Sequence, residues 1–535
     1  MYIQYFKRSH HMKHLKHSNE TSRQQFHLAF AGLQAFNKIR IGQICIFAVL
    51  GIALLMYGCD SEPTTGVEDV APLMIELSSP HTNSDGYSVV NQATVVISGT
   101  ATDGMGVTRM TYTLNGSAEQ EISISTGSSV NFEFTIPALE PGSNHLVVWA
   151  FNGAGNQAQA QRLLVYAVVR YNVIVAGEAN NGSSRPRAIN ASGDIAFKWE
   201  SQNDHRGAQG FVWSAGALTE LVLPDGHVLM GVSGINASRV AVGDLEDVGT
   251  GALGWRDVPV VWENGQPTVL PLLPGYSMGG ASAINELGTI AGYVMDDGWD
   301  NWAAVLWRDG ETMQISANAG ASDINSSGVV TGSIGGGNDD RAFRWDNGQM
   351  TPLEPLAGMT ISRGMAINDA GDVVGKSYNR DTFPRTRATL WRGTTATSLG
   401  EFPGGMYYRT WAVNNHLQAV GAVDYKEPGS RTSFISENGR MSLLNHLTNG
   451  EWDIIEAFGI NDAGQIVALA LRTGSDPFLN AFHSVLLEPV DAEAGAEMSV
   501  SVAQRPIRSE ADRLMIERLR SRSVFDRLRE GKTPR

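Results

Sequence analysis

The stretch GMAINDAGDVVGKS, residues 364–377, gathers oxygen-bearing side chains around a glycine. Asn368, Asp369 and Asp372 lie within five residues of one another, with Gly371 among them. Oxygen ligands around a glycine turn are typical of a calcium-binding loop. The same residue types also suit a tight β-turn, because Asn, Asp and Gly tolerate positive φ or form hydrogen bonds with their own backbone. Taken alone, the stretch fits a metal site and a turn equally well.

The stretch is one copy of a motif that occurs seven times within residues 170–490. Each copy has an apolar run, an Asn, a short turn and a second apolar run such as VVG. The Asn recurs at a spacing of 40–49 residues: Asn190, Asn236, Asn285, Asn325, Asn368, Asn414 and Asn461. The positions of Asp369 and Asp372 hold other residue types in other copies, and metal ligands would not vary so freely. We therefore expect a turn at each copy.

Each repeat contains further strand signals. A strand ending in Trp follows the motif in five copies, whereas the last two copies have Ser436 and Ser484 at this position. The five tryptophans are Trp213, Trp262, Trp307, Trp345 and Trp391. Asn-Gly or Asp-Gly pairs then predict tight hairpins, and a fourth strand ends the unit. Four short strands per repeat predict a blade of a β-propeller. The seventh repeat lacks a fourth strand, and we expect residues 170–177 to supply it and close the ring.

The motif Asn-Asp-x-Gly-x-Val-Val-Gly, followed by an Ala-Phe-x-Trp-like strand, resembles the HAF family of extracellular repeats. The resemblance extends over the seven copies in residues 170–490. It implies a β-propeller-like architecture outside the cytoplasm. It implies no particular activity, because these repeats are not tied to one reaction.

The repeat architecture places the connections on two opposite faces. The turns after strands one and three, which include the Asn turns, share one face, here called the turn face. The connections after strands two and four share the other, here called the loop face. Variable loops on a rigid scaffold are where binding usually occurs. The connections after strand two are long and dissimilar, at 244–257, 295–302, 335–341, 378–387 and 424–431.

These loops carry two sets of candidate residues. Five acids could bind calcium or be solvated loop acids: Asp296, Asp297, Asp300, Asp339 and Asp340. Four aromatic residues could stack on a sugar ring or pack the loops together: Trp299, Trp302, Tyr407 and Tyr408. Calcium is the one cofactor that this pattern admits.

Charged residues recur five positions before the repeated Asn, where we expect the mouth of the central channel on the loop face. They are Arg185, Arg363, Arg409 and Glu456. The arginines could bind a carboxylate or an acidic sugar. Alternatively, they pair with the surrounding acids.

The segment GYSMG, residues 275–279, matches the nucleophile elbow of α/β-hydrolases at Ser277. That chemistry needs a helix directly after the turn, whereas a strand signal follows here. We therefore assign no catalytic residue. The sequence favours a binding or scaffold module for protein or polysaccharide over the alternative, a polysaccharide lyase or glycoside hydrolase. A hydrolase would need two carboxylates about 5–10 Å apart in one pocket.

Residues 73–168 alternate apolar and polar residues in segments separated by turn signals, as in TVVISGTATD and VNFEFTIPAL. This pattern predicts a β-sandwich. The segment resembles the bacterial immunoglobulin-like domains of secreted proteins, with Asp103 and Asn156 at turn positions. That resemblance implies a spacer.

Charge limits the classes of partner. Residues 59–504 hold 23 basic and 49 acidic residues. So acidic a body repels nucleic acid, whose affinity for proteins comes mainly from cations on phosphates. We expect a protein or polysaccharide ligand, no nucleic acid, and a monomer.

The segment IRIGQICIFAVLGIALLMYGCDSE, residues 39–62, has basic residues, an apolar run and Gly58-Cys59. The run is shorter than the ~20 residues of a membrane span and suits the apolar region of a signal peptide. The segment resembles a bacterial lipoprotein signal, although Met56 stands where Leu is usual. The resemblance implies lipidation of Cys59 in the bacterial cell envelope; a plain transmembrane anchor is the alternative.

We thus expect an all-β protein in five parts. Residues 1–58 are a leader with a signal peptide, and residues 59–72 are a polar tether. An Ig-like β-sandwich at 73–168 precedes a seven-bladed β-propeller at 169–490. A basic tail at 491–535 forms an amphipathic helix or is disordered.

Overall fold

The computed structural model describes residues 71–82, 87–167, 170–177, 182–201, 208–247, 256–336, 339–379, 386–402, 404–425, 431–474 and 481–490. The leader with Cys59, the tether up to residue 70 and the tail from residue 491 lie outside the described residues, so the predictions for them stay predictions. In the described part of the chain, no helix is long and apolar enough to cross a membrane.

The first domain is a β-sandwich in which β3 pairs with four other strands, while β7 pairs with β6 and β2. Its strands are β1 (Met74–Ser79), β2 (Tyr87–Val90), β3 (Val95–Leu114), β4 (Gln120–Ile122), β5 (Gly127–Ile136), β6 (Gly142–Asn152) and β7 (Gln157–Tyr166). The first half of β3 pairs with β1 and β5, and its second half pairs with β4 and β6. Alternate residues such as Val130, Phe132 and Leu146 point into one apolar core, as the period-two pattern predicts.

Seven four-stranded antiparallel sheets follow, and each is one blade. Blade 1 has β9 (Gly182–Ile189), β10 (Ile195–Ser201), β11 (Gln209–Ser214) and β12 (Ala217–Leu221). Blade 2 has β13 (His227–Ile235), β14 (Ala241–Asp247), β15 (Arg256–Glu263) and β16 (Gln266–Val269). Blade 3 has β17 (Met278–Ile284), β18 (Ile290–Met295), β19 (Trp302–Arg308) and β20 (Glu311–Ala317). Blade 4 has β21 (Ala319–Ile324), β22 (Val330–Ile334), β23 (Arg341–Asp346) and β24 (Gln349–Leu353).

The last three blades follow the same order. Blade 5 has β25 (Ile361–Ile367), β26 (Val373–Tyr378), β27 (Thr386–Arg392) and β28 (Thr395–Ser398). Blade 6 has β29 (Gly405–Val413), β30 (Ala419–Tyr425), β31 (Arg431–Glu437) and β32 (Arg440–Leu443), followed by a 3-10 turn at Leu444–His446. Blade 7 has β33 (Trp452–Ile460), β34 (Ile466–Arg472) and β35 (His483–Pro489), with β8 (Tyr171–Gly177) as its fourth strand.

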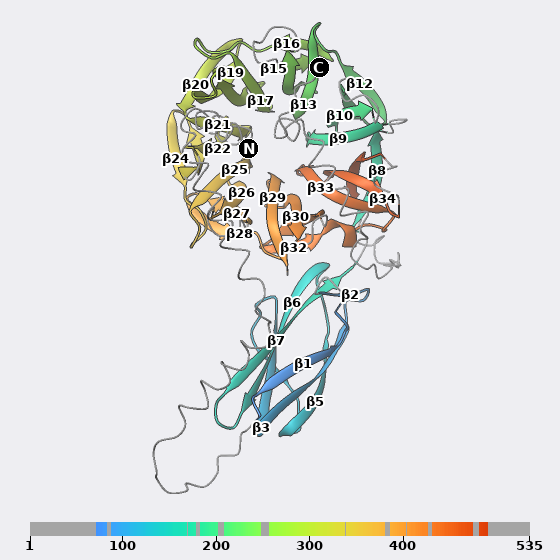
Figure 1. Cartoon of the computed structure of the whole chain (residues 1–535). Coiled ribbons are helices and arrows are strands. Elements are labelled where there is room, and N and C mark those ends of the chain that lie inside the picture. Colours follow the sequence, from blue (N-terminus) through green and yellow to red (C-terminus); the bar gives the residue numbers. More distant parts are fainter. Residues whose placement is uncertain are drawn as a thin grey trace, which may run out of the picture. The chain divides into compact units, whose positions relative to one another are not determined.

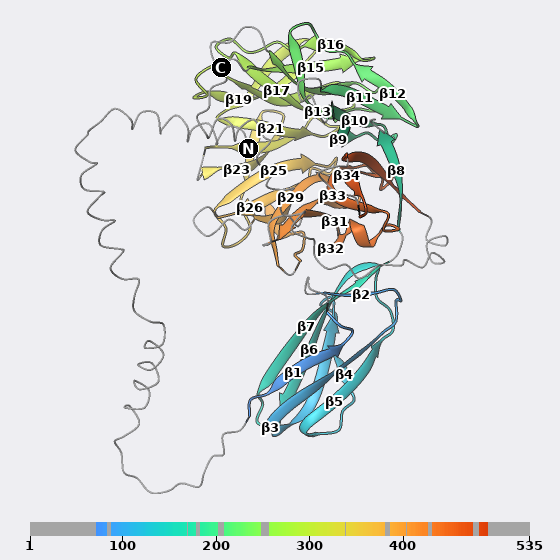
Figure 2. The same ribbon diagram turned by 45° about the vertical axis from the view of Figure 1, so that its right-hand side comes forward.

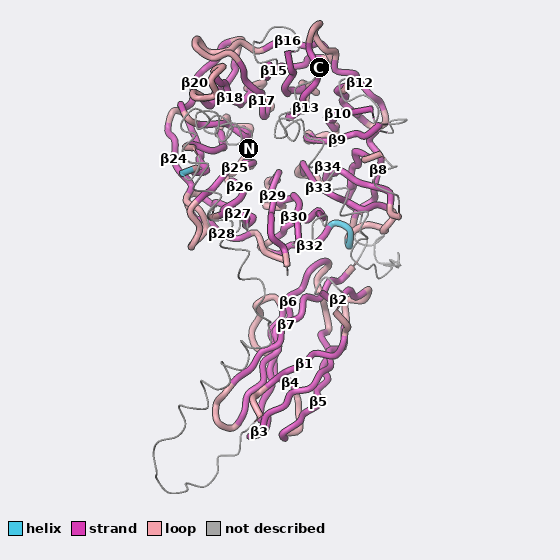
Figure 3. The backbone as a smooth tube through the Cα atoms, viewed as in Figure 1, coloured by secondary structure: helices cyan, strands magenta, loops and turns pink. Residues whose placement is uncertain are grey.

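The blades form a closed ring, with the first strand of each blade nearest the common axis (Figure 1). Figure 2 shows the same blades from a second direction, and Figure 3 shows that strands make up most of both domains. The predicted closure is confirmed, because β8 pairs antiparallel with β35 and places Ile174 opposite Leu486. The ring therefore joins its two ends through backbone hydrogen bonds and leaves no long unpaired edge there.

The predicted hairpins are also confirmed. Asn347 and Gly348 both have positive φ, 45° and 90°, as a type I′ turn requires. The pairs Asn264-Gly265, Asp309-Gly310 and Asn438-Gly439 have the same pattern. These turns fix the register between strands three and four of their blades.

Candidate functional site

The repeated Asn side chains join the blades in a ring of hydrogen bonds. Each Nδ2 donates to the backbone oxygen of the Asn in the next blade, at 3.0–3.3 Å, and Asn461 donates to Asn190 O across the closure. Each Oδ1 accepts the backbone N–H group four residues later, and in five of the blades it also accepts the one two residues later, as Asn285 does from Thr289 and Leu287. All seven side chains are buried. The Asn is therefore both a turn residue and a bond between blades.

The neighbouring acids of the opening motif serve the same ring. Asp372 accepts a hydrogen bond from Asn368 Nδ2 at 3.4 Å. Asp369 accepts the backbone N–H of Ser326 and the side-chain N–H of Asn415, each at 3.0 Å. Burial raises the pKa of Asp369, but these hydrogen bonds outweigh it and hold the pKa below its ordinary value. Residues 368–372 thus form a structural turn between β25 and β26.

The repeated Trp makes a second bond between blades. The indole N–H of Trp262, Trp307 and Trp391 donates to a carbonyl that follows the last strand of the preceding blade, at 2.6–2.8 Å. Ser436, which replaces Trp in blade 6, donates its hydroxyl to Leu399 O at 2.6 Å in the equivalent position. The repeats thus build a rigid scaffold, and function must come from positions that differ between blades.

One cross-strand pair per blade differs strongly in chemistry. In every blade, the residue five positions before the Asn pairs directly with one residue of strand two. The pairs are Arg185–Lys198, Gly231–Asp244, Gly280–Tyr293, Gly320–Ser333, Arg363–Lys376, Arg409–Ala422 and Glu456–Leu469. Blades 2–4 have glycine on the inner strand, whereas the other four blades have a charged side chain. This asymmetry is the candidate functional site.

The charged side chains of blades 6 and 7 form a chain of ion pairs. Asp424 accepts from Arg409 at 2.7 Å and from Arg431 at 2.8 Å. Arg431 also donates to Glu456 at 2.8 Å, and Glu456 accepts the indole N–H of Trp411 at 2.8 Å. Burial raises the pKa of Asp424, but Arg431 and Arg409 outweigh it, so the pKa lies below its ordinary value. Arg409 and Glu456 are therefore both paired, in agreement with the alternative that these residues pair with surrounding charged groups.

The cations of blade 5 are less completely neutralised. Arg363 pairs with Asp340, which is buried. The ammonium of Lys376 makes no hydrogen bond or ion pair with a described residue and lies 5.7 Å from the ring centroid of Tyr378. Burial, followed by repulsion from Arg363 and Arg409, lowers the pKa of Lys376 to about 8, although Asp340 acts in the opposite direction. Blade 1 differs, because Glu200 lies 3.6 Å from Arg185 and 2.6 Å from Lys198.

Blade 2 carries two partly buried acids, Asp244 and Asp257. Asp244 accepts the backbone N–H of Ala281 at 2.9 Å, and a Cβ added at Gly280 would lie 2.7 Å from Asp244 Oδ1. Burial and the charge of Asp257 raise the pKa of Asp244 to about 8. Burial and the charge of Glu246 raise the pKa of Asp257 to about 6, against a hydrogen bond of 3.5 Å from Tyr293. The glycine at position 280 thus makes room for Asp244 between blades 2 and 3.

Two of the four candidate aromatic residues pack inside the protein, which was one of the two alternatives. Tyr408 is fully buried, and its hydroxyl accepts the backbone N–H of Phe402 at 2.7 Å. Trp302 is 6% exposed. Neither ring has a free face for a ligand, since each packs inside its blade. Trp299 and Tyr407 are partly exposed and stay candidates.

Three of the five acids considered for calcium, Asp296, Asp297 and Asp340, form side-chain contacts within the protein. Among the described residues, no group of three or more His, Cys, Asp or Glu is arranged to hold a metal ion. Asp297 lies 3.1 Å from Arg256 and accepts the hydroxyl of Ser277 at 2.7 Å. Asp296 accepts the backbone N–H of Asp300 within the turn at 3.0 Å, while Asp340 pairs with Arg363 and Asp339 is exposed. Ser277 precedes a strand, β17, and thus lacks the helix that a nucleophile elbow needs.

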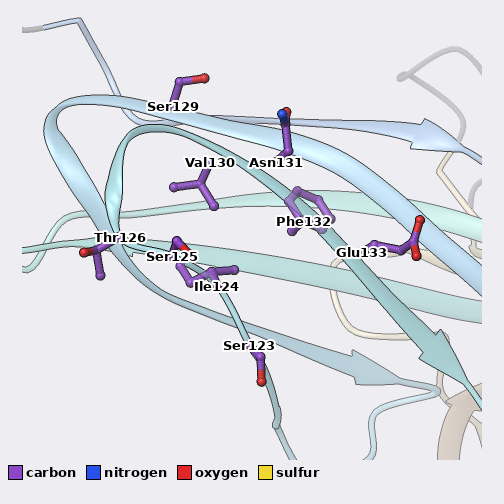
Figure 4. Close-up of a pocket in the computed structure, with 9 residues that line it drawn as sticks. All are labelled: Ser123, Ile124, Ser125, Thr126, Ser129, Val130, Asn131, Phe132 and Glu133. Atoms are coloured by element: carbon purple, nitrogen blue, oxygen red, sulfur yellow. The ribbon is translucent and has the colours of Figure 1, made fainter.

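An open groove of about 500 Å³ lies on the Ig-like domain, away from these residues. Its lining comes from β5 and the connection before it, and includes the hydroxyl groups of Ser123, Ser125, Thr126 and Ser129 (Figure 4). Glu133 is the one charged residue of the lining. None of the residues predicted from sequence lines this groove, and we do not assign the candidate site to it.

Sequence reasoning missed Lys376 and Asp244, which lie on the second strands of their blades, and Arg187, which lies on the first strand of blade 1. For Lys376 and Asp244, the available signal was their position in strand two, which is Lys, Asp, Tyr, Ser, Lys, Ala or Leu along the seven repeats, while the residue before it is Gly or Ala in six of them. Variation in one position of an otherwise uniform repeat indicates a site, because the scaffold does not require it.

Comparisons with known proteins bear on the two domains differently. The bacterial Ig domain family matches residues 75–148. No curated protein sequence matches the chain. Solved structures are similar to it at low identity. A structural genomics protein of unknown function from Bacteroides thetaiotaomicron is 12% identical over 70% of this chain and 97% of its own, with a TM-score of 0.28.

Two further structures are similar at the same level. TolB from Acinetobacter baumannii is 11% identical over 57% of this chain and 77% of its own, with a TM-score of 0.32. YCF48 from Cyanidioschyzon merolae is 10% identical over 59% of this chain and 98% of its own, also with a TM-score of 0.32. The chain contains a bacterial Ig domain followed by a seven-bladed β-propeller.

Proposed function

We propose that the chain is a membrane-tethered extracytoplasmic lipoprotein whose propeller binds a protein or polysaccharide ligand through its loop face, as a monomer. One observation carries the proposal. The seven blades share the ring of Asn side chains but differ at the cross-strand pair five residues before the Asn. The inner residue of this pair is glycine in blades 2–4 and a charged residue in the other four blades. Chemical variation at equivalent positions of a rigid, repeated scaffold is what a specific binding site requires.

The alternative, an enzyme that degrades polysaccharide, draws on Asp244 and Asp257. Their carboxyl groups have raised pKa values, as a catalytic acid needs. Asp244, however, packs against Gly280 and accepts a backbone hydrogen bond from Ala281. These contacts give the carboxyl a structural partner, and we therefore favour binding.

Arrays of defined polysaccharides and purified envelope proteins test the binding proposal. We expect the full chain to bind at least one ligand, and the double variant Trp299→Ala/Tyr407→Ala to bind it about tenfold more weakly, because partly exposed aromatic residues contribute most to interfaces. Leu287→Ala, at an exposed residue of the turn face, is the control and should bind normally. Absence of binding across the array, or equal loss in the control, would reject the proposal.

The anchor is tested through the two cysteines of the chain. We expect Cys59→Ser to move the protein from the membrane fraction to the soluble fraction, because the acyl chains supply the membrane affinity. Cys45→Ser is the matched control and should leave the protein in the membrane fraction. If Cys59→Ser still needs detergent for extraction, residues 39–62 act as a transmembrane anchor and the lipoprotein proposal fails.

A further inference from the structure

Each inner strand contains a β-bulge at the third residue before its Asn. In blade 1, for example, Ala188 and Pro186 pair with consecutive residues of β10, so Arg187 has no partner in the ladder. The same register shift occurs in every other blade. The seven bulge residues, here called the collar, are Arg187, Ser233, Ser282, Ser322, Met365, Trp411 and Phe458. A bulge changes the direction of its side chain and is common next to functional sites.

The collar has two unlike halves. Blades 2–4 contribute serine, whereas blades 5, 6, 7 and 1 contribute large side chains. The same three blades have glycine two residues earlier, and at Gly231 and Gly320 an added Cβ would meet no atom within 4 Å. Small residues and open space therefore lie on one side of the axis, and bulky residues lie on the other.

Side chains of three blades meet in the bulky half. The guanidinium carbon of Arg187 lies 5.4 Å from the ring centroid of Trp411 and 5.3 Å from that of Phe458. The two rings are 6.0 Å apart, and Trp411 is held by its hydrogen bond to Glu456. Arg187 comes from blade 1 and Trp411 from blade 6, so their contact reaches past blade 7.

The aromatic rings hold the guanidinium of Arg187 in place, but no acid among the described residues forms an ion pair with it. Its side chain is exposed and forms no hydrogen bond or ion pair with a described residue. The charge of Arg187 acts on Asp244, but burial and the charge of Asp257 still raise the pKa of Asp244 to about 8, which leaves this carboxyl mostly protonated at neutral pH. A planar guanidinium that stacks on aromatic rings, with its N–H groups unused, is suited to bidentate binding of a carboxylate.

We infer that Arg187 binds the carboxylate of a uronate residue in an acidic polysaccharide, with the collar serines facing the hydroxyl groups of the sugar. This inference rests on the proposed function and names its ligand class. Lys376, which forms no ion pair with a described residue, adds positive charge in blade 5, and this charge favours an anionic ligand although the body of the protein is acidic. Hydroxyl-bearing serines opposite aromatic rings fit a sugar better than a peptide, since both the polar rim and the apolar face of a sugar ring then find partners.

Calorimetric titration of the full chain tests the inference with three probes of similar length. They are a hexauronate, a neutral hexasaccharide and a hexaglutamate peptide. We expect the hexauronate alone to bind, and its affinity to fall when the salt concentration is raised. Arg187→Gln should weaken this binding roughly 10- to 100-fold, and Arg187→Lys should restore only part of it, because an ammonium lacks the planar fork.

Arg392→Gln is the matched control, since Arg392 is an exposed arginine beside the Asn turn of blade 5. It should bind the hexauronate normally, and the thermal transition of each variant should match that of the unchanged chain. Preference for the peptide, or hexauronate binding that Arg187→Gln leaves intact, overturns the inference while the propeller remains a binding module. If the full chain binds none of the probes, the inference also fails, whereas the proposed function fails only if the wider arrays are negative too.

Discussion

Replacement of Asn285 by alanine is expected to lower the free energy of unfolding by about 2–5 kcal/mol, although the residue belongs to a turn. The side chain donates to Asn325 O at 3.1 Å and accepts from Leu287 N and Thr289 N at 3.1 and 2.9 Å. Each buried backbone group left without a partner costs about 1–3 kcal/mol. Urea denaturation followed by tryptophan fluorescence measures the change.

Two further variants separate the contributions. Leu287→Ala truncates a residue of the same turn that is 78% exposed, and it should change stability by less than about 0.5 kcal/mol. Asn285→Asp keeps the acceptor but replaces the donor to blade 4 by a carboxylate, so it should cost more as the pH rises and the carboxylate ionises. If Asn285→Ala proved as mild as Leu287→Ala, the hydrogen-bonded ring would not stabilise the propeller.

The β-propeller could be predicted because the same strand and turn signals recur in each of the seven repeats. Asn-Gly and Asp-Gly pairs fix hairpins locally, and the position of residues 170–177 relative to the first Asn identifies the closing strand. The role of the Asn itself could not be predicted in full. In most blades its Nδ2 donates to a residue 40–49 positions later in the sequence. Residues so far apart in the sequence come into contact only when neighbouring blades pack together.

The candidate site could be predicted only in part, for a similar reason. Counting back from the Asn identified charged residues at Arg363, Arg409 and Glu456, and each of them forms an ion pair, as one of the two alternatives expected. Arg187 was missed because a bulge changes the direction of a side chain without leaving a mark in the residue pattern. Tyr408 was placed on the surface because its burial depends on packing within blade 6, which a loop sequence does not reveal.

Replacement of Trp391 by alanine is expected to cost about 3–5 kcal/mol, as large buried aromatic residues do. Trp391 is fully buried in blade 5, and its indole N–H donates to Glu354 O, just beyond β24 of blade 4, at 2.6 Å. Trp391→Phe should retain much of the packing and lose the hydrogen bond, at about 1–2 kcal/mol. Urea denaturation again gives the values.

Blade 6 offers a test of the hydrogen bond without the ring. Ser436 is buried and donates to Leu399 O at 2.6 Å from the equivalent position, so Ser436→Ala should cost about as much as Trp391→Phe. Met313→Ala, on the outer strand of blade 3, is the control for truncation of a large apolar side chain, since Met313 is 46% exposed. Agreement between Ser436→Ala and Trp391→Phe would mean that two unlike residues perform one task, the attachment of each blade to the end of the one before. If Ser436→Ala had no effect, the repeated Trp would act through packing alone, and the Asn ring would be the main polar connection between the blades.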